Sequence, residues 1–196
     1  MEKNMFKSKL FILSKELITL KIEFSILKIL DKEKSLIYGR YGNFFIIIIN
    51  SINEVTILRM SKIIVDNKDS LNLFNLINFI DDGNNLKRIT NNNKGKIKEI
   101  KNQNNIFRKE LEEFKKMVKA INDYRDKGGA HIDKQLANKN KTIKIRLNLN
   151  EFEKIIEEIE KIFNYYWEKI VGGGFSALDE ESAADQLKEI IRNLPK

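Results

Sequence analysis

The sequence predicts an all-α protein, built as a bundle of four to six helices. Three long segments carry apolar residues at steps of three and four, which is the spacing of one helix face. They cover about residues 5–30, 97–125 (at this spacing from Phe107 on) and 150–170. A single segment, residues 142–149, alternates apolar and polar residues as a strand does. A lone strand has no partner in one chain, so we expect an extended stretch there or pairing across a dimer.

Length and composition limit the possible functions. The 196 residues fit one domain and are enough for a substantial core. With no cysteine and one histidine, the chain cannot form a disulfide framework, a thiolate metal site or a multi-histidine site within one subunit. The net charge of +8 makes an anionic partner plausible, most simply nucleic acid. The competing source of that charge is an abundance of Lys, Asn and Ile, as an AT-rich coding sequence produces.

The sequence indicates a cytoplasmic protein that makes no membrane contact. Its first residues are broken by charges and do not form the apolar core of a secretory signal. The most apolar run, residues 44–49, is too short to span a bilayer. We therefore expect this run to be a deeply buried helix segment or a strand.

The first helix carries a continuous apolar stripe. Its members step by four and three throughout: Phe6, Leu10, Leu13, Leu17, Leu20, Phe24 and Leu27. Such a narrow seam suits a helix packed lengthwise inside a bundle or against a second subunit. The polar connection that follows ends in two tyrosines flanking Gly39 and Arg40. Arg40 and the tyrosines suit stacking on RNA bases, and the alternative is an ordinary loop with glycine turns.

The second helix is predicted over about residues 43–65. It is apolar on most sides at its start, so we expect it to be central in the bundle. Asn53 and Arg59 interrupt its apolar surface, and polar residues on a central helix need partners. They either hydrogen-bond internally for packing or support a functional site.

Ser70 is the predicted N-cap of a short third helix with an apolar inner face. Residues 91–96, rich in asparagine and lysine, are predicted to form a mobile loop. Lys94 and Lys96 could attract an RNA backbone there without sequence specificity, and a solvated loop is the alternative.

Near the C-terminus, Asn150 is the predicted N-cap of an amphipathic helix that ends at three glycines, residues 172–174. We therefore divide the chain into a bundle domain, residues 1–171, and a glycine hinge with a last helix, residues 172–196. Ser176 or Asp179 is expected to cap this last helix, which would dock on the bundle or bind a partner.

The motif that organises the chain is Tyr124-Arg125-Asp126-Lys127-Gly128-Gly129-Ala130-His131-Ile132-Asp133. The apolar stripe of the preceding helix runs through Val118 and Ile121, and its next step lands on Arg125. A guanidinium on a core-facing stripe must be paired or must line a cleft. One interpretation is a helix end with a salt-bridged arginine and an incidental histidine. The other is a functional site, because an arginine holds phosphate and an imidazole transfers protons near neutral pH.

This motif resembles the signature of the HEPN superfamily of helical ribonucleases, most closely its abortive-infection U-type (AbiU-like) branch. In that signature an arginine and a polar residue are followed by a histidine, with four to six residues between the arginine and the histidine. Here Arg125 and His131 are separated by five residues, and Asp126 fills the polar position. The resemblance covers about residues 5–171.

The resemblance implies a metal-independent, cofactor-free endoribonuclease that is a two-fold homodimer, with two motifs facing one cleft. The ribose 2′-hydroxyl would attack the adjacent phosphate and leave 2′,3′-cyclic phosphate ends. Arg125, His131 and Asp126 would be catalytic. The supporting residues would be Asn53, Arg59, Tyr124 and Asp133. The RNA contacts would be Lys127, Arg40, Lys94 and Lys96.

The same resemblance implies a toxin or antiphage effector, with a neutralising antitoxin or regulatory protein as a possible partner. Members paired with a nucleotidyltransferase antitoxin often carry a modified tyrosine two residues after the histidine. This chain has Asp133 at that position, so we do not expect that form of control.

Two other classes of protein remain open. A HEPN-like domain can be catalytically inactive and act as a dimerisation, interaction or RNA-binding module. In that case Arg125 and Asp126 would form a structural ion pair. A DNA-binding regulator has only the charge in its favour, because no short helix-turn-helix with a polar recognition face is present.

Overall fold

The computed structural model describes residues 2–33, 42–126, 148–174 and 180–193, with side chains left out of the description at 180–184. Within these ranges the chain forms eight α-helices and one π-helical turn, and no strand. They are α1 (Glu2–Lys32), α3 (Gly42–Ile64), α4 (Leu73–Asp81), α5 (Gly83–Ile89), α6 (Lys94–Glu113), α7 (Lys115–Tyr124), α9 (Leu149–Tyr166), η2 (Trp167–Val171) and α10 (Glu180–Arg192). The all-α prediction is confirmed.

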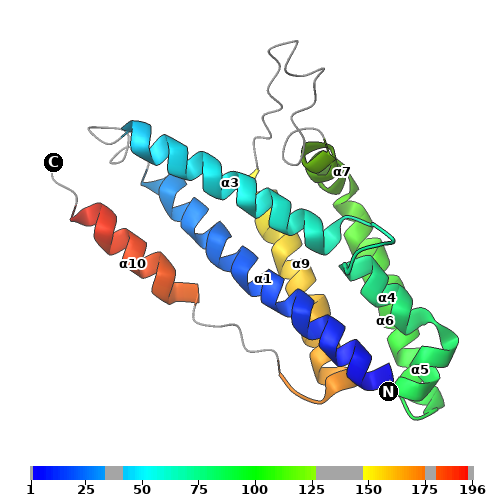
Figure 1. Ribbon diagram of the computed structural model, residues 1–196. Coiled ribbons are helices and arrows are strands. Elements are labelled where there is room, and N and C mark those ends of the chain that lie inside the picture. Colours follow the sequence, from blue (N-terminus) through cyan, green and yellow to red (C-terminus); the bar gives the residue numbers. More distant parts are fainter. Residues whose placement is uncertain (1, 34–41, 127–147, 175–179, 194–196) are drawn as a thin grey trace.

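Helix α1 is the centre of the bundle. It packs against α3, α9, α10, η2 and the short helices α4 and α5, and Figure 1 shows it running between α9 and α10. All seven members of its predicted stripe, from Phe6 to Leu27, are at most 5 % exposed. The stripe therefore faces the core of this chain, as the packed-bundle interpretation requires.

Helix α3 has the predicted length, but its first half is not central. Phe45 is buried against Ile29 and Leu30 of α1, whereas Phe44 and Ile47 are 60 % and 66 % exposed. The prediction of a deeply buried run at residues 44–49 is wrong because only one face of this end of α3 is covered by other helices. The second half does enter the core, through Ile57, Met60, Ile63 and Ile64.

Of the helices described, α3 alone is long and apolar enough to cross a membrane by length and composition. Its most apolar window is 28 % buried inside the bundle. Core helices of water-soluble proteins pass the same test, so this is weak evidence for a membrane span.

The middle of the chain is more helical than its polar sequence predicts. The N-cap of α4 is Asn72, whose side chain accepts a hydrogen bond from the Asn75 amide, so the prediction of Ser70 is wrong. Residues 83–89 form α5, capped by Asp82. The predicted mobile loop at 91–96 is a turn followed by the first residues of α6, with Asn93 as N-cap.

The long predicted helix before the motif is two helices, because α6 ends at Glu113 and α7 begins at Lys115. This break and the extra helix α5 explain why the described residues hold more than the four to six helices expected. The N-cap of α9 is Asn148, not Asn150, since the Asn148 side chain accepts from the Asn150 and Glu151 amides. As predicted, the helical segment stops at Gly172, whose φ of 88° is a left-handed conformation that glycine tolerates.

Helix α10 packs along α1, where Ile191 joins a small cluster with Ile29, Leu30 and Phe45. The division of the chain at residue 172 and the homodimer stay predictions. Residues 142–147 of the alternating segment and the expected caps Ser176 and Asp179 lie outside the described residues.

Candidate functional site

A cavity of about 730 Å³ lies where α1, the end of α3, the α3–α4 connection and the end of α7 meet. Its walls combine apolar, charged and neutral polar side chains. They are Ile12, Leu13, Glu16, Ser61, Lys62, Asn67, Ser70, Leu71, Arg125 and Asp126. The first two residues of the predicted catalytic set, Arg125 and Asp126, therefore line a real cavity.

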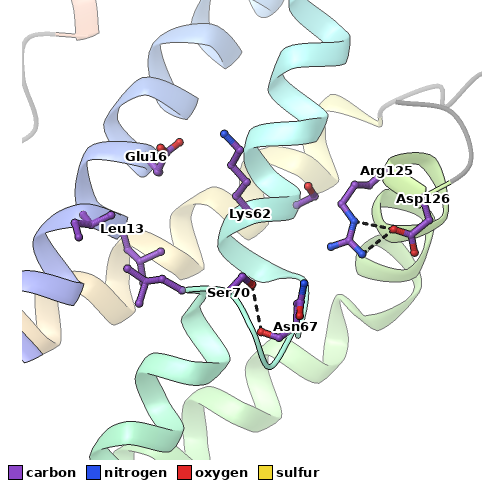
Figure 2. Close-up of a pocket in the computed structure, with 10 residues that line it drawn as sticks. Leu13, Glu16, Lys62, Asn67, Ser70, Arg125 and Asp126 are labelled. Atoms are coloured by element: carbon purple, nitrogen blue, oxygen red, sulfur yellow. Dashed lines mark hydrogen bonds and ion pairs between the residues drawn. The ribbon is translucent and has the colours of Figure 1, made fainter. Parts of the chain in front are cut away.

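Arg125 is placed by the core packing of α7. Ile121, one turn earlier, is 1 % exposed, and α7 packs against α3. The same stripe brings Arg125 to the cavity wall, where its side chain is 29 % exposed. Figure 2 shows the guanidinium group pointing from the end of α7 into the cavity region. The apolar stripe through Val118 and Ile121 predicted that Arg125 would be paired or would line a cleft, and Arg125 does lie at the cavity wall.

Arg125 is also paired with its neighbour. Its Nε and one terminal nitrogen lie 2.8 Å and 2.7 Å from the same Asp126 oxygen. This contact uses two of the five N–H groups of a guanidinium. Asp126 is half exposed, so the pair remains accessible to a ligand from solvent. Asp126 therefore holds the Arg125 guanidinium in one orientation.

The floor of the cavity is a firmly hydrogen-bonded connection. The fully buried Asn72 donates from Nδ2 to the Asn67 carbonyl oxygen at 2.9 Å. Asn75 donates to the same oxygen at 2.8 Å and to the Ser70 carbonyl oxygen at 2.6 Å. These hydrogen bonds tie the connection that carries Asn67 and Ser70 to the start of α4.

Arg59, predicted to support the site, does not line the cavity. It bridges α3 to α1 by donating to Glu16 at 2.5 Å and to Glu23 at 3.0 and 3.1 Å. Burial alone would lower the pKa of Arg59, but its hydrogen bonds and ion pairs with Glu23 and Glu16 outweigh burial and raise it. Because Glu16 is a cavity residue, Arg59 contacts the site through this carboxylate.

The other predicted residues fall in different places. Tyr124 is half-buried against the core, where burial and the negative charge of Glu54 raise the pKa of its hydroxyl. Asn53 is half-buried on α3 and is not among the cavity residues. Arg40, Lys127, His131 and Asp133 lie outside the described residues.

Lys94 and Lys96 lie at the opposite end of the α6–α7 arm. Both are exposed on the first turn of α6, which is about 30 Å long at 1.5 Å per residue. Lys94 lines a separate cavity of about 420 Å³ with Lys87, Lys98 and Lys101. The structure therefore does not bring these predicted RNA contacts to Arg125.

Sequence reasoning missed Glu16, Lys62 and Asn67 as site residues. One signal was present for Glu16, since Glu16 and Glu23 are seven residues apart on α1 and so share the face that meets Arg59. Nothing local marked Lys62 or Asn67, which reach the cavity only through the packing of α3 and its following connection.

An all-helical bundle with an arginine and an acidic residue at the end of a helix, beside a cavity, is the class of fold and site expected of a HEPN domain. The family described as AbiU2 (HEPN_AbiU2) matches residues 7–193 of the sequence. The chain belongs to this family, and the match includes α10. HEPN domains are generally associated with ribonuclease activity and abortive infection. Searches of curated proteins and of solved structures gave no significant match.

Proposed function

We propose that this protein is a metal-independent endoribonuclease that acts as a toxin or antiphage effector in the cytoplasm. The observation that carries the proposal is the position of Arg125, oriented by Asp126 at a cavity wall, in a chain of the AbiU2 family. The positive net charge of the chain favours an RNA substrate.

The proposed reaction begins with attack of the ribose 2′-oxygen on the adjacent phosphorus. The new O2′–P bond forms as the bond from phosphorus to the 5′-oxygen breaks, which leaves a 2′,3′-cyclic phosphate and a 5′-hydroxyl. A base must take the proton of the 2′-hydroxyl, and an acid must supply one to the 5′-oxygen. The guanidinium of Arg125 stabilises the extra negative charge of the phosphorane.

His131 is the proposed proton-transfer group, since imidazole titrates near neutral pH. One imidazole does not readily serve as base and acid in the same step. We therefore propose a two-fold homodimer in which His131 of the partner subunit supplies the second imidazole. A neutralising protein that restrains the activity belongs to the same proposal.

A specific observation also favours a second candidate, a HEPN-like interaction module without catalysis. The pair between Arg125 and Asp126 is the structural ion pair that this alternative predicts. Under it, the protein would form a folded dimer that binds RNA weakly or not at all and does not cleave it.

Expression in a bacterial host separates the two candidates. A ribonuclease is expected to arrest growth, and Arg125→Ala and His131→Ala are each expected to relieve the arrest at equal protein levels. Arg192→Ala, on the last described turn of α10, is the matched control that should remain toxic. Growth arrest that persists in both site variants, or no arrest by a well-expressed wild type, would contradict the proposed nuclease.

A further inference from the structure

The cavity beside Arg125 has two chemically different ends. In Figure 2, Arg125 and Asp126 lie at one end, Leu13 and Glu16 at the other, and Lys62 between them. Arg125 brings positive charge to its end of the wall, and Figure 2 shows the Lys62 side chain extending toward Glu16. The far part combines the Glu16 carboxylate with the apolar side chain of Leu13. Ile12 and Leu71 add further apolar side chains to the cavity wall.

The size and construction of the cavity suit a small polar ligand with a flat apolar face. Its volume of about 730 Å³ lies within the range of about 300–1,000 Å³ typical of small-molecule sites. Ile12 is 52 % exposed at the cavity wall, so its apolar side chain can be covered by the flat face of a bound ligand. The floor between the two ends is fixed by the hydrogen bonds from Asn72 and Asn75.

Glu16 determines which ligand edge fits the far end. A carboxylate can only accept hydrogen bonds, so its partner must present donors. Arg59 binds one Glu16 oxygen at 2.5 Å and holds the carboxylate in place. Among the four RNA bases, guanine alone presents two adjacent donors on its pairing edge, N1–H and the 2-amino group. Adenine, cytosine and uracil each place an acceptor beside their donor, which a carboxylate repels.

We propose that this cavity binds one nucleotide of the RNA substrate and selects guanine through Glu16. The guanine edge would donate to Glu16, the base face would cover Ile12 and Leu71, and the phosphate would bind Arg125. The inference rests on the proposed ribonuclease function, because it assigns the substrate preference of the same site. It makes Glu16 a specificity-determining residue and Arg59 a positioning residue.

The test is binding of GMP, AMP, CMP and UMP to the full-length protein by titration calorimetry in the presence of EDTA. Wild type is expected to bind GMP about tenfold more tightly than each of the other three. Glu16→Gln should abolish this preference, because an amide presents a donor where the carboxylate presents only acceptors. Arg125→Gln should weaken binding of all four nucleotides alike and leave the preference for GMP unchanged.

Glu23→Gln is the matched control. Glu23 pairs with the same arginine at 3.0 Å but is not among the cavity residues, so this variant should keep the preference for GMP. Circular dichroism of each variant establishes that it is folded. Equal affinity of wild type for the four nucleotides would overturn the inference, and so would equal loss of preference in the two glutamine variants.

The binding test is independent of the cleavage chemistry, since it requires no reaction at His131. RNA cleavage by a protein without a GMP preference would overturn the guanine subsite and leave the ribonuclease standing. A GMP preference that depends on Glu16, in a protein that cleaves no RNA, would support the nucleotide site and contradict the ribonuclease.

Discussion

Arg59 on α3 lies 2.5 Å from Glu16 on α1, and Glu16 in turn lines the cavity that contains Arg125. Glu23, two turns further along α1, binds the same guanidinium at 3.0 Å. One arginine therefore joins the two central helices and fixes a carboxylate of the candidate site. The same contact therefore contributes to the stability of the bundle and to the geometry of the site.

Removal of Arg59 is expected to destabilise the protein. Arg59→Ala leaves two partly buried carboxylates close together without their common cation, and we expect a loss of about 2 kcal/mol in the free energy of unfolding. Urea unfolding followed by circular dichroism measures this loss. Arg88→Ala is the control, because Arg88 pairs with Glu2 while remaining 67 % exposed, and its loss should stay within about 0.5 kcal/mol. Equal losses in the two variants would contradict the claim that Arg59 stabilises the contact between α1 and α3.

Two neighbouring tyrosines are expected to respond oppositely to loss of the hydroxyl group. The Tyr166 hydroxyl donates to Asn104 Oδ1 at 2.8 Å in the core, and Asn104 donates in turn to Asp81 at 2.6 Å. Tyr166→Phe leaves the Asn104 oxygen unsatisfied, so we expect a loss of about 1–3 kcal/mol.

Tyr165→Phe is the matched control for that substitution. Its buried hydroxyl oxygen has no hydrogen-bond partner among the described residues, and burial, with Glu99 and Glu168, raises its pKa to about 12. Removing this hydroxyl should leave the unfolding free energy unchanged or raise it. A larger loss for Tyr165→Phe than for Tyr166→Phe, by the same urea titration, would show that the network through Asn104 is not the stabilising one.

The stability of a Glu158→Gln variant relative to wild type is expected to change with pH. Burial and the neighbouring Glu110 carboxyl raise the pKa of Glu158, whereas a hydrogen bond from Lys161 lowers that of Glu110. A carboxyl whose pKa is raised by folding stabilises the protein fully at a pH below its pKa in the unfolded chain, which is about 4.3. This stabilisation is lost as the pH rises through the pKa of the folded state. Glutamine does not titrate, so the stability of the variant relative to wild type should increase between about pH 4 and pH 7.

Thermal unfolding at both pH values measures that change. Glu157→Gln, on the exposed face of α9, is the control and should show the same difference from wild type at each pH. A Glu158→Gln difference that is independent of pH would mean that this carboxyl is not perturbed by burial.

The part of the fold that could be predicted is the part that depends on the local spacing of apolar residues along the chain. The stripe of α1 from Phe6 to Leu27 is buried throughout, and the stripe of α7 correctly leads to Arg125. Helix caps were missed by two residues, as with Ser70 and Asn72. Both residue types cap helices well, and the choice between them depends on backbone angles that the sequence does not specify.

The errors and omissions have a common physical cause, which is that packing partners are not local. The apolar start of α3 predicts burial, yet Phe44 is exposed because the sequence does not say which faces other helices cover. Glu16, Lys62 and Asn67 come from separate elements and meet only in the folded bundle. The sequence can mark a single unusual residue such as Arg125, but it cannot identify the residues that converge on it.

The central claim is that the arginine–histidine motif cleaves RNA without a metal. The most direct measurement incubates purified wild type and His131→Ala with labelled single-stranded RNA in EDTA and then identifies the product ends. We expect cleavage by wild type alone, with 2′,3′-cyclic phosphate and 5′-hydroxyl ends. Equal cleavage by the His131→Ala protein, or no cleavage by a folded wild-type dimer that also fails to arrest growth, would contradict the claim.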